Sequence, residues 1–113
     1  MASRKLVAAS STTILMSVLA HGESYGYAII ARVRALSGGD LQWTEGMLYP
    51  VLHRLERKGW IRATWRAADN GRERKYYRLT AAGTRELARE RAEWDRVHAT
   101  LSSLTPLPGG ARG

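Results

Sequence analysis

The sequence predicts a mainly α-helical fold with one small β-hairpin, and three patterns along the chain support this class. An amphipathic helix is expected over residues 44–58, a basic hairpin over 60–79, and a long helix with a narrow apolar stripe over 81–104. The 113 residues allow one compact domain, or a smaller domain plus an arm that needs a partner to cover its apolar side. The long final helix favours the second arrangement.

The stretch from Thr44 to Lys58 has the most regular helical pattern in the chain. Its apolar residues fall at i, i+3, i+4 and i+7 and form one stripe that must be buried: Leu48, Val51, Leu52 and Leu55. Thr44 is a suitable N-cap and Gly59 a suitable stop. Pro50 removes one backbone hydrogen bond beyond the first turn, so we expect a distorted helix start. The outer face of this helix is left free to meet a partner.

Two helices are expected before this stretch. The first covers residues 6–20, and its apolar patch consists of Ile14, Leu15, Val18 and Leu19. The second runs from Tyr25 to Ser37, is capped by Ser24, and turns Ile29, Val33 and Leu36 inward before Gly38 and Gly39 end it. Gly26 in its first turn indicates close packing against another element. Three helices with short connections match a helix-turn-helix arrangement.

A β-hairpin follows the third helix. Residues 60–65 and 74–79 are rich in strand-forming side chains, and Asp69, Asn70 and Gly71 between them tolerate the positive φ of a turn. Tyr76 and Tyr77 must point to opposite faces, and we expect Tyr77 to lie inward with Leu79. Core or hairpin packing is expected for Trp43, Trp60 and Trp65.

The last predicted helix extends from Ala81 to Leu104, with Thr80 as its cap and Pro106 beyond its end. Its apolar residues follow three-and-four spacing: Leu87, Trp94, Val97, Leu101 and Leu104. The other faces are densely charged, and so narrow a stripe on so long a helix is typical of a two-helix seam. We therefore expect a homodimer in which residues 1–80 form a winged helix-turn-helix domain, 81–104 a dimerisation helix and 105–113 a disordered tail.

Charge and composition indicate a nucleic-acid partner. The net charge is +8, and residues 1–80 hold 13 Lys and Arg against 6 Asp and Glu, whereas residues 81–104 hold 4 of each kind. The chain has no cysteine and no apolar run near the roughly 18 residues of a membrane span, so we expect a cytoplasmic protein without disulfides. The three histidines share no metal-ligand spacing, and no metal site is expected.

Catalytic motifs are missing from the sequence. No nucleophile elbow, glycine-rich phosphate loop or His-Glu-x-x-His pattern occurs, so we expect neither an enzyme nor a cofactor. A non-specific architectural DNA-binding protein without a ligand is the alternative that the charge alone equally supports. Only a defined recognition helix on a two-fold dimer predicts palindromic half-sites about one helical turn apart.

The candidate DNA contacts come from the third helix and the hairpin. A recognition helix enters the major groove by its N-terminal half, so the candidates near base edges or the nearest phosphates are Thr44, Gly46, Met47, Tyr49, Pro50 and His53. The candidates for phosphate contact are Arg54 on the helix and Arg72, Arg74 and Lys75 near the hairpin turn. A solvated charged ribbon remains the alternative for any single hairpin arginine.

Several motifs, taken in order, resemble the PadR family of bacterial transcriptional regulators. They are residues 21–27 (HGESYGY), 48–56 (LYPVLHRLE), 59–61 (GWI) and 74–80 (RKYYRLT) followed by Ala82-Gly83. The chain is most similar to short members with a single C-terminal helix. The resemblance implies a dimeric repressor that binds an inverted-repeat operator and is released by a signal, often a phenolic or other aromatic compound.

Some short, multidrug-sensing members have the pattern Trp-x-Arg-Val on the C-terminal helix, and residues 94–97 (WDRV) match it. In those relatives two tryptophans of the dimer form a flat pore for planar aromatic ligands. The resemblance therefore implies that Trp94 binds such a ligand, with Leu6, Ala9 and Thr13 lining the pore. His98 stands where those sensors can have an acidic residue, which argues against carrying over a preference for cationic drugs. Simple dimer packing is the equally weighted alternative for Trp94.

Overall fold

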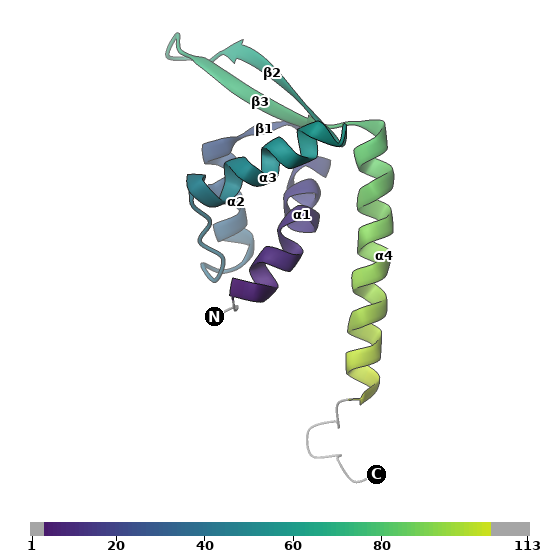
Figure 1. Ribbon diagram of the computed structural model, residues 1–113. Helices are drawn as coiled ribbons and strands as arrows, with labels where there is room; N and C mark the ends of the chain where they lie inside the picture. Colours follow the sequence, from purple (N-terminus) through teal and green to yellow (C-terminus); the bar gives the residue numbers. More distant parts are fainter. Residues whose placement is uncertain (1–3, 105–113) are drawn as a thin grey trace.

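The computed structural model describes residues 4–104, with side chains from residue 9 onward (Figure 1). This part of the chain forms four helices and one three-stranded antiparallel sheet, in the order α1 (Arg4–Ala20), β1 (Ser24–Tyr25), α2 (Gly26–Leu36), α3 (Glu45–Arg57), β2 (Ile61–Ala67), β3 (Glu73–Leu79) and α4 (Ala81–Leu104). The predicted fold class, a winged helix-turn-helix followed by a C-terminal helix, is confirmed. The tail over 105–113, predicted to be disordered, lies outside the described residues.

The core lies among α1, α2 and α3 and is closed by the base of the hairpin. All four stripe residues of α3 are buried, together with Leu15 and Leu19 of α1 and Ile29 and Val33 of α2. The apolar spacing in the sequence thus predicted these buried positions correctly. In Figure 1 the hairpin projects from one side of this three-helix unit, and α4 runs beside α1 and continues past it.

The start of α2 differs from its predicted form. Ser24 and Tyr25 form the short strand β1, which pairs with Tyr77 and Tyr76 of β3, so the sheet order is β1-β3-β2. Tyr25 occupies the N-cap position, with no side-chain cap hydrogen bond. The predicted Ser24 cap is therefore wrong, because the backbone of Ser24 is used in strand pairing. The glycine pair that ends the helix was predicted correctly, since Gly38 and Gly39 have φ of 63° and 88°.

Leu36 was predicted to lie inward and does not. It is 66% exposed. It lies in the last turn of α2, where it borders an open apolar groove with His21 and Leu41 instead of joining the core. Three-residue spacing from a buried residue such as Val33 thus does not by itself predict burial at a helix end, because no other element covers the final turn.

The hairpin forms as predicted, but at the turn end the first strand is two residues longer than predicted and the second strand one residue longer. Ile61 pairs with Leu79 at its base and Ala67 with Glu73 near its tip. Gly71 has a φ of 82°, and the side-chain oxygen of Asn70 accepts a hydrogen bond from the Arg72 amide at 3.1 Å. These local features fix the register of the two strands.

Trp43 and Trp65 lie in different environments. Trp43, just before α3, is 5% exposed and belongs to the core, as expected. Trp65, in the middle of β2, is 60% exposed and does not belong to the core; its ring contact within the hairpin is with Lys75, whose Nζ lies 6.0 Å from the ring centre. Tyr77 is 1% exposed, as predicted. Burial, followed by the effects of Glu56 and Tyr49, raises the pKa of the Tyr77 phenol to about 12.

The helix α4 begins at a well-formed cap and ends far from the core. Thr80 Oγ1 accepts a hydrogen bond from the Gly83 amide at 3.0 Å, as expected for an N-cap. Gly83 is buried against the backbone of Trp60, and Leu87 is 5% exposed. Every residue from Arg91 to Leu104 is exposed in the single chain. Among the described helices, none combines the length and apolar character that a membrane span needs.

Candidate nucleic-acid interface and aromatic cavity

The helix α3 presents a face that the core leaves open. Thr44 Oγ1 accepts a hydrogen bond from the Met47 amide at 3.2 Å, which confirms the predicted cap. Pro50 lies inside the helix, but α3 is continuous through it, so the expected distortion does not interrupt the helix. Exposed residues on this face are Thr44, Gly46, Pro50 and His53.

Tyr49 and Met47 differ from the other candidates on α3 because both are half-buried and pack against the core. A Cβ atom at Gly26 would lie 2.5 Å from the Tyr49 hydroxyl oxygen. The close packing expected at Gly26 is therefore present, and its partner is the recognition-helix candidate itself. This contact lets α2 fix the position of Tyr49, whose ring lies 6.5 Å from that of His53.

Arg54 is turned toward α1. Its Nη2 donates a hydrogen bond to Thr12 Oγ1 at 2.7 Å. The side chain therefore lies on the flank of α3 that faces α1, whereas His53 occupies the open face. Arg54 thus has a partner within the chain that the sequence pattern did not indicate.

The three hairpin candidates have distinct surroundings. Arg74 stacks its guanidinium 4.0 Å from the ring centre of Tyr25, and Lys75 Nζ lies 3.9 Å from a carboxylate oxygen of Glu56 on α3. Arg72 is exposed at the turn, and within the described residues its guanidinium makes no ion pair or ring contact. Arg72 is thus the most available cation of the three.

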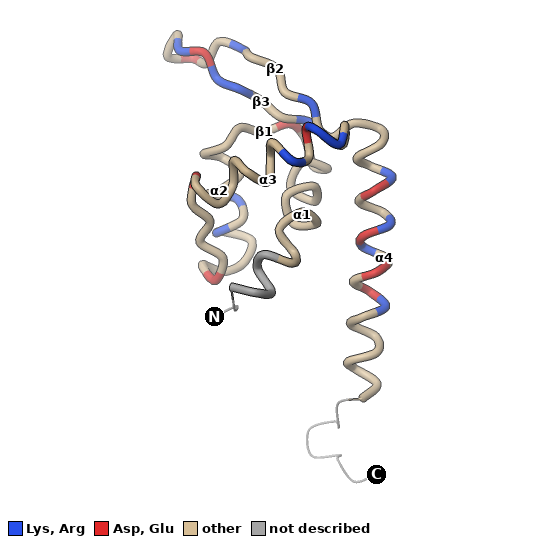
Figure 2. The backbone as a smooth tube through the Cα atoms, viewed as in Figure 1, with Lys and Arg blue, Asp and Glu red and all other residues tan. Residues whose placement is uncertain are grey.

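The strand register separates the hairpin cations onto two faces. Arg62 pairs with Arg78 and Arg66 with Arg74, so four arginines share the face opposite Tyr77. Arg66 is held by an ion pair with Glu23 and by the ring of Tyr76, whose centre lies 4.1 Å away. Figure 2 shows the concentration of Lys and Arg along the hairpin and the end of α3, whereas α4 has both signs mixed. Lys and Arg are therefore concentrated in the hairpin and the end of α3 and not in α4, and four of the hairpin arginines lie on the sheet face that points away from the core.

A cavity of about 370 Å³ lies between α1 and the middle of α4. Of the residues predicted to line a ligand site there, Ala9, Thr13 and Trp94 border it, and Leu6 belongs to α1 but its side chain lies outside the described residues. His98 is exposed and does not border this cavity in the single chain. The structure therefore brings together most, but not all, of the predicted set.

Hydrogen bonds connect the two helices across this cavity. Trp94 Nε1 donates to Thr13 Oγ1 at 3.1 Å, and the same hydroxyl donates to Glu90 Oε1 at 2.6 Å. Burial raises the pKa of the Glu90 carboxyl, whereas hydrogen bonding from Arg89 lowers the pKa of Glu86. Arg89 also pairs with Glu93 at 2.9 Å. Glu90 is therefore the carboxylate of the cavity that is bound by a hydroxyl instead of a cation.

The family of the protein follows from its similarity to known proteins. Residues 15–89 match the transcriptional regulator PadR-like family. The chain belongs to this family. Another relative is a protein from Lysinibacillus sphaericus that has been given the name Uncharacterized protein X. It is 33% identical over 85 residues, which cover 75% of this chain and 78% of that protein.

Solved structures of PadR-like and other regulators have the same fold as this PadR-family chain. A transcriptional regulator from Clostridium thermocellum is 27% identical, with a TM-score of 0.84, and the match covers 93% of this chain and 99% of that one. A PadR-like transcriptional regulator from Bacillus cereus is 25% identical, with a TM-score of 0.78, and the match covers 88% and 95% of the two chains. Membership of the PadR family supports DNA binding and transcription regulation, and the two solved structures named above are of transcriptional regulators.

Sequence reasoning missed two features of this PadR-family protein. Glu90 was not singled out, although it lies four residues before Trp94 and therefore on the same helix face. Strand β1 was missed because two residues give no periodic signal. Within the described residues, no group of three His, Cys, Asp or Glu side chains could hold a metal ion.

Proposed function

We propose that this PadR-family protein is a dimeric repressor that binds an inverted-repeat operator and is released by a planar aromatic compound. Residues 1–80 would supply the DNA-binding domain and residues 81–104 the dimerisation helix. The observation that carries the proposal is the open face of α3 beside a hairpin with six cations and two acidic residues.

Operator recognition is assigned to α3. Its exposed face offers the Thr44 hydroxyl at the N-cap, an approachable backbone at Gly46 in the first turn and the His53 ring past the middle of the helix. Tyr49 and Met47 are partly exposed beside them, and Tyr49 is held by its contact with Gly26. In this proposal Arg72 binds phosphate at the hairpin turn, with Arg74 and Lys75 along the strand nearer to α3.

Dimerisation is assigned to the end of α4. Its apolar stripe is uncovered in the single chain: Trp94 is 37% exposed, Val97 49%, Leu101 59% and Leu104 75%. An apolar stripe of this length on one projecting helix is stabilised when a second copy covers it. Leu87, which the spacing also assigned to the seam, is already buried in its own chain, so the proposed seam begins at Trp94.

Ligand binding is assigned to the cavity beside Trp94. The indole gives a flat surface for stacking, the Thr13 hydroxyl fixes the ring, and Glu90 provides an acceptor for a donor group on the ligand. A ligand bound here touches both α1 and α4, so it can change how the DNA-binding domain sits on the dimerisation helix. This coupling would give the release of DNA.

Selection of bound duplexes from a random pool is the most direct test of operator binding. The expected result is an enriched inverted repeat whose half-site centres lie about one helical turn apart. A pool that binds without enrichment of any sequence would instead support a non-specific architectural protein. Sedimentation of the free protein is expected to give a dimer, and Leu101→Glu is expected to give a monomer because it puts a charge in the seam.

Trp fluorescence tests the ligand assignment. A planar aromatic dye is expected to quench the emission, and Trp94→Ala is expected to abolish binding of the dye while the protein stays dimeric. Trp60→Phe is the matched control, since Trp60 lies at the base of the hairpin and does not border the cavity. Unchanged affinity of the dye for the Trp94→Ala dimer would contradict the assignment.

A further inference from the structure

Trp65 has an exposure that the packing of the hairpin does not explain. Side chains alternate between the two faces of a strand, so Ile61, Ala63 and Trp65 of β2 share one face. Along this face burial decreases from the base outward: Ile61 is 2% exposed and Trp65 is 60% exposed. The Trp65 indole therefore lies beyond the part of the strand that the helices cover.

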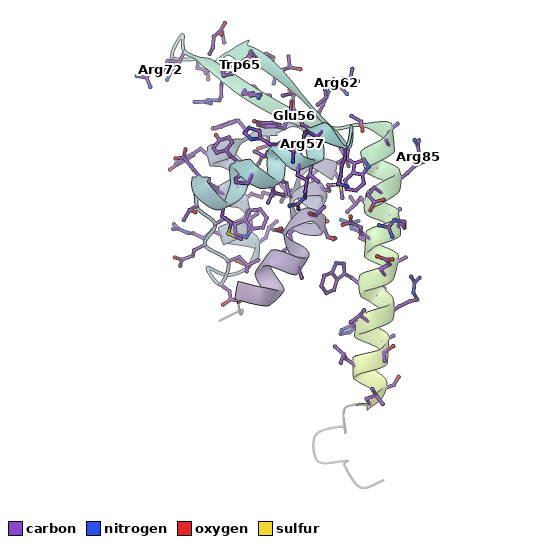
Figure 3. The ribbon with its side chains drawn as sticks, viewed as in Figure 1. Glu56, Arg57, Arg62, Trp65, Arg72 and Arg85 are labelled. Carbon is purple, nitrogen blue, oxygen red and sulfur yellow. The ribbon has the colours of Figure 1, made fainter. Side chains whose placement is uncertain are left out.

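The face that includes Trp65 is the face that packs on α3. Its partner across the strands is Lys75, and the next residue on the same face of β3 is the buried Tyr77. Lys75 Nζ lies 3.9 Å from a carboxylate oxygen of Glu56, which belongs to α3. Figure 3 shows Trp65 on the hairpin and Glu56 on the helix below it. Trp65 thus emerges beside the recognition-helix candidate, on the side of the sheet that faces α3.

Trp65 has few contacts within its own chain. Lys75 Nζ is 6.0 Å from the ring centre, which is the outer limit of a cation–π interaction, and the same amine is 5.5 Å from the Tyr77 ring. A large indole in water costs free energy that burial against a partner would recover. The position of Trp65 therefore points to a contact outside the chain.

We propose that Trp65 is a DNA-contact residue whose indole packs against the deoxyribose groups of the duplex backbone beside α3. The proposal rests on the proposed function, because it uses the same DNA-binding surface. A backbone of apolar sugars and anionic phosphates suits a flat apolar ring on a positively charged hairpin. Lys75 shares the face of Trp65, and the other hairpin cations lie at the turn or on the opposite face of the same two strands: Arg62, Arg66, Arg72, Arg74 and Arg78. A second copy of this chain has the same positive hairpin and would be repelled from it.

The role differs from that of the hairpin cations in a measurable way. The indole is uncharged, so a variant without it loses packing against DNA but releases as many counterions on binding as the wild type. Trp65→Ala should therefore weaken binding without changing its salt dependence. The expected loss is about tenfold in Kd, as for truncation of an indole that becomes half-buried on binding. Because sugars are common to all sequences, the loss should be equal on operator and on random DNA.

The experiment measures fluorescence anisotropy of the full chain on two labelled duplexes, the operator selected from the random pool and a scrambled duplex of equal length, each over a salt series. Trp65→Ala is compared with Trp65→Phe, which keeps an aromatic ring and is expected to recover most of the affinity. Leu36→Ala is the matched control, because Leu36 is also an exposed apolar residue, at 66%, but lies on α2. Circular dichroism checks that each variant is folded.

Wild-type affinity of folded Trp65→Ala on both duplexes overturns the inference but leaves the proposed function intact. A Trp65→Ala variant whose self-association falls in sedimentation without DNA, with DNA affinity per dimer unchanged, makes a second copy the partner and also overturns it. A wild-type chain that binds neither duplex overturns the inference and the proposed function together. Protection of the indole from acrylamide quenching by DNA in the wild type, lost in Trp65→Phe, gives independent support.

Discussion

Thr13 on α1 and Trp94 on α4 are joined by a hydrogen bond of 3.1 Å from the indole nitrogen to the hydroxyl oxygen. The hydroxyl donates its own proton to Glu90 at 2.6 Å, so one small side chain satisfies two partners on the projecting helix. These bonds couple α1, which the proposed function assigns to the DNA-binding domain, to the helix that it assigns to dimerisation. The cavity between them is thus bordered by both units.

Thr13→Val is expected to break both bonds without changing the volume of the side chain. The free energy of unfolding should fall by about 1 kcal/mol, since each bond is partly exposed and Glu90 would keep no hydroxyl donor. Thr13→Ser keeps the hydroxyl and should retain most of the stability. Urea denaturation followed by circular dichroism measures the difference, and equal midpoints for the valine and wild-type proteins would contradict it.

Glu90→Gln should change how stability depends on pH. Burial raises the pKa of Glu90 in the folded chain above its unfolded value, so the folded state favours the protonated acid. The resulting stability is present below about pH 4.3, the usual pKa of glutamate, and is lost as the pH rises through the higher folded value. As the pH rises from the unfolded pKa to the folded pKa of Glu90, the wild type should therefore lose stability relative to Glu90→Gln. Urea midpoints at a series of pH values measure this loss.

Glu86→Gln is a matched control with the opposite sign. The pKa of Glu86 is lowered, first by its hydrogen bond from Arg89, so its carboxylate stabilises the folded state above the usual pKa. That stability is lost as the pH falls through the lowered value. Glu86→Gln should therefore become less stable relative to wild type as the pH rises, and parallel curves for the two variants would contradict the assignment of these shifts.

Two buried glycines should respond differently to alanine. At Gly83 the added Cβ would lie 2.0 Å from the backbone oxygen of Trp60, which cannot move without displacing the start of α4. Gly83→Ala is expected to lower the free energy of unfolding by at least about 2 kcal/mol. Thermal unfolding measures this loss. A variant as stable as wild type would show that α4 shifts freely at its first turn.

Gly26→Ala should alter DNA recognition more than stability. The added Cβ meets the hydroxyl end of the Tyr49 side chain, which can rotate away, so the expected loss of stability is below about 1 kcal/mol. Displacement of Tyr49 should reduce the ratio of operator to random-DNA affinity, as Tyr49→Ala should. Anisotropy titrations on both duplexes measure this ratio, and an unchanged ratio in both variants would remove Tyr49 from base recognition.

Elements with local signals were predictable from the sequence. The stripe of α3, its Thr44 cap and the turn at Gly71 each depend on residues close together in the chain, and all three were predicted correctly. Strand β1 was missed because its only determinant is pairing with Tyr76 and Tyr77, more than fifty positions later. Such pairing leaves no periodic pattern in a two-residue segment.

The candidate site was predictable in its elements but not in its contacts. Sequence spacing identified α3, the hairpin and the face of α4 that includes Trp94. It could not indicate that Arg54 turns toward Thr12, that Lys75 faces Glu56, or that Trp65 is uncovered, because each depends on how separate elements pack. These contacts decide which cations remain available for phosphate.

Arg72→Ala and Arg54→Ala remove the same charge and should have different effects on DNA binding. Arg72 is exposed at the hairpin turn, so its loss should weaken binding on all sequences and reduce the slope of log K against log salt by about 0.9, the value for one phosphate contact. Arg54 donates to Thr12 at 2.7 Å and lies against α1, so its loss should leave the slope unchanged. Anisotropy titrations over a salt series distinguish a direct phosphate contact by Arg72 from a diffuse effect of positive charge. A diffuse effect would reduce the slope equally in the two variants. Equal reductions would therefore remove Arg72 from the proposed phosphate contacts and leave the hairpin as a diffuse source of positive potential.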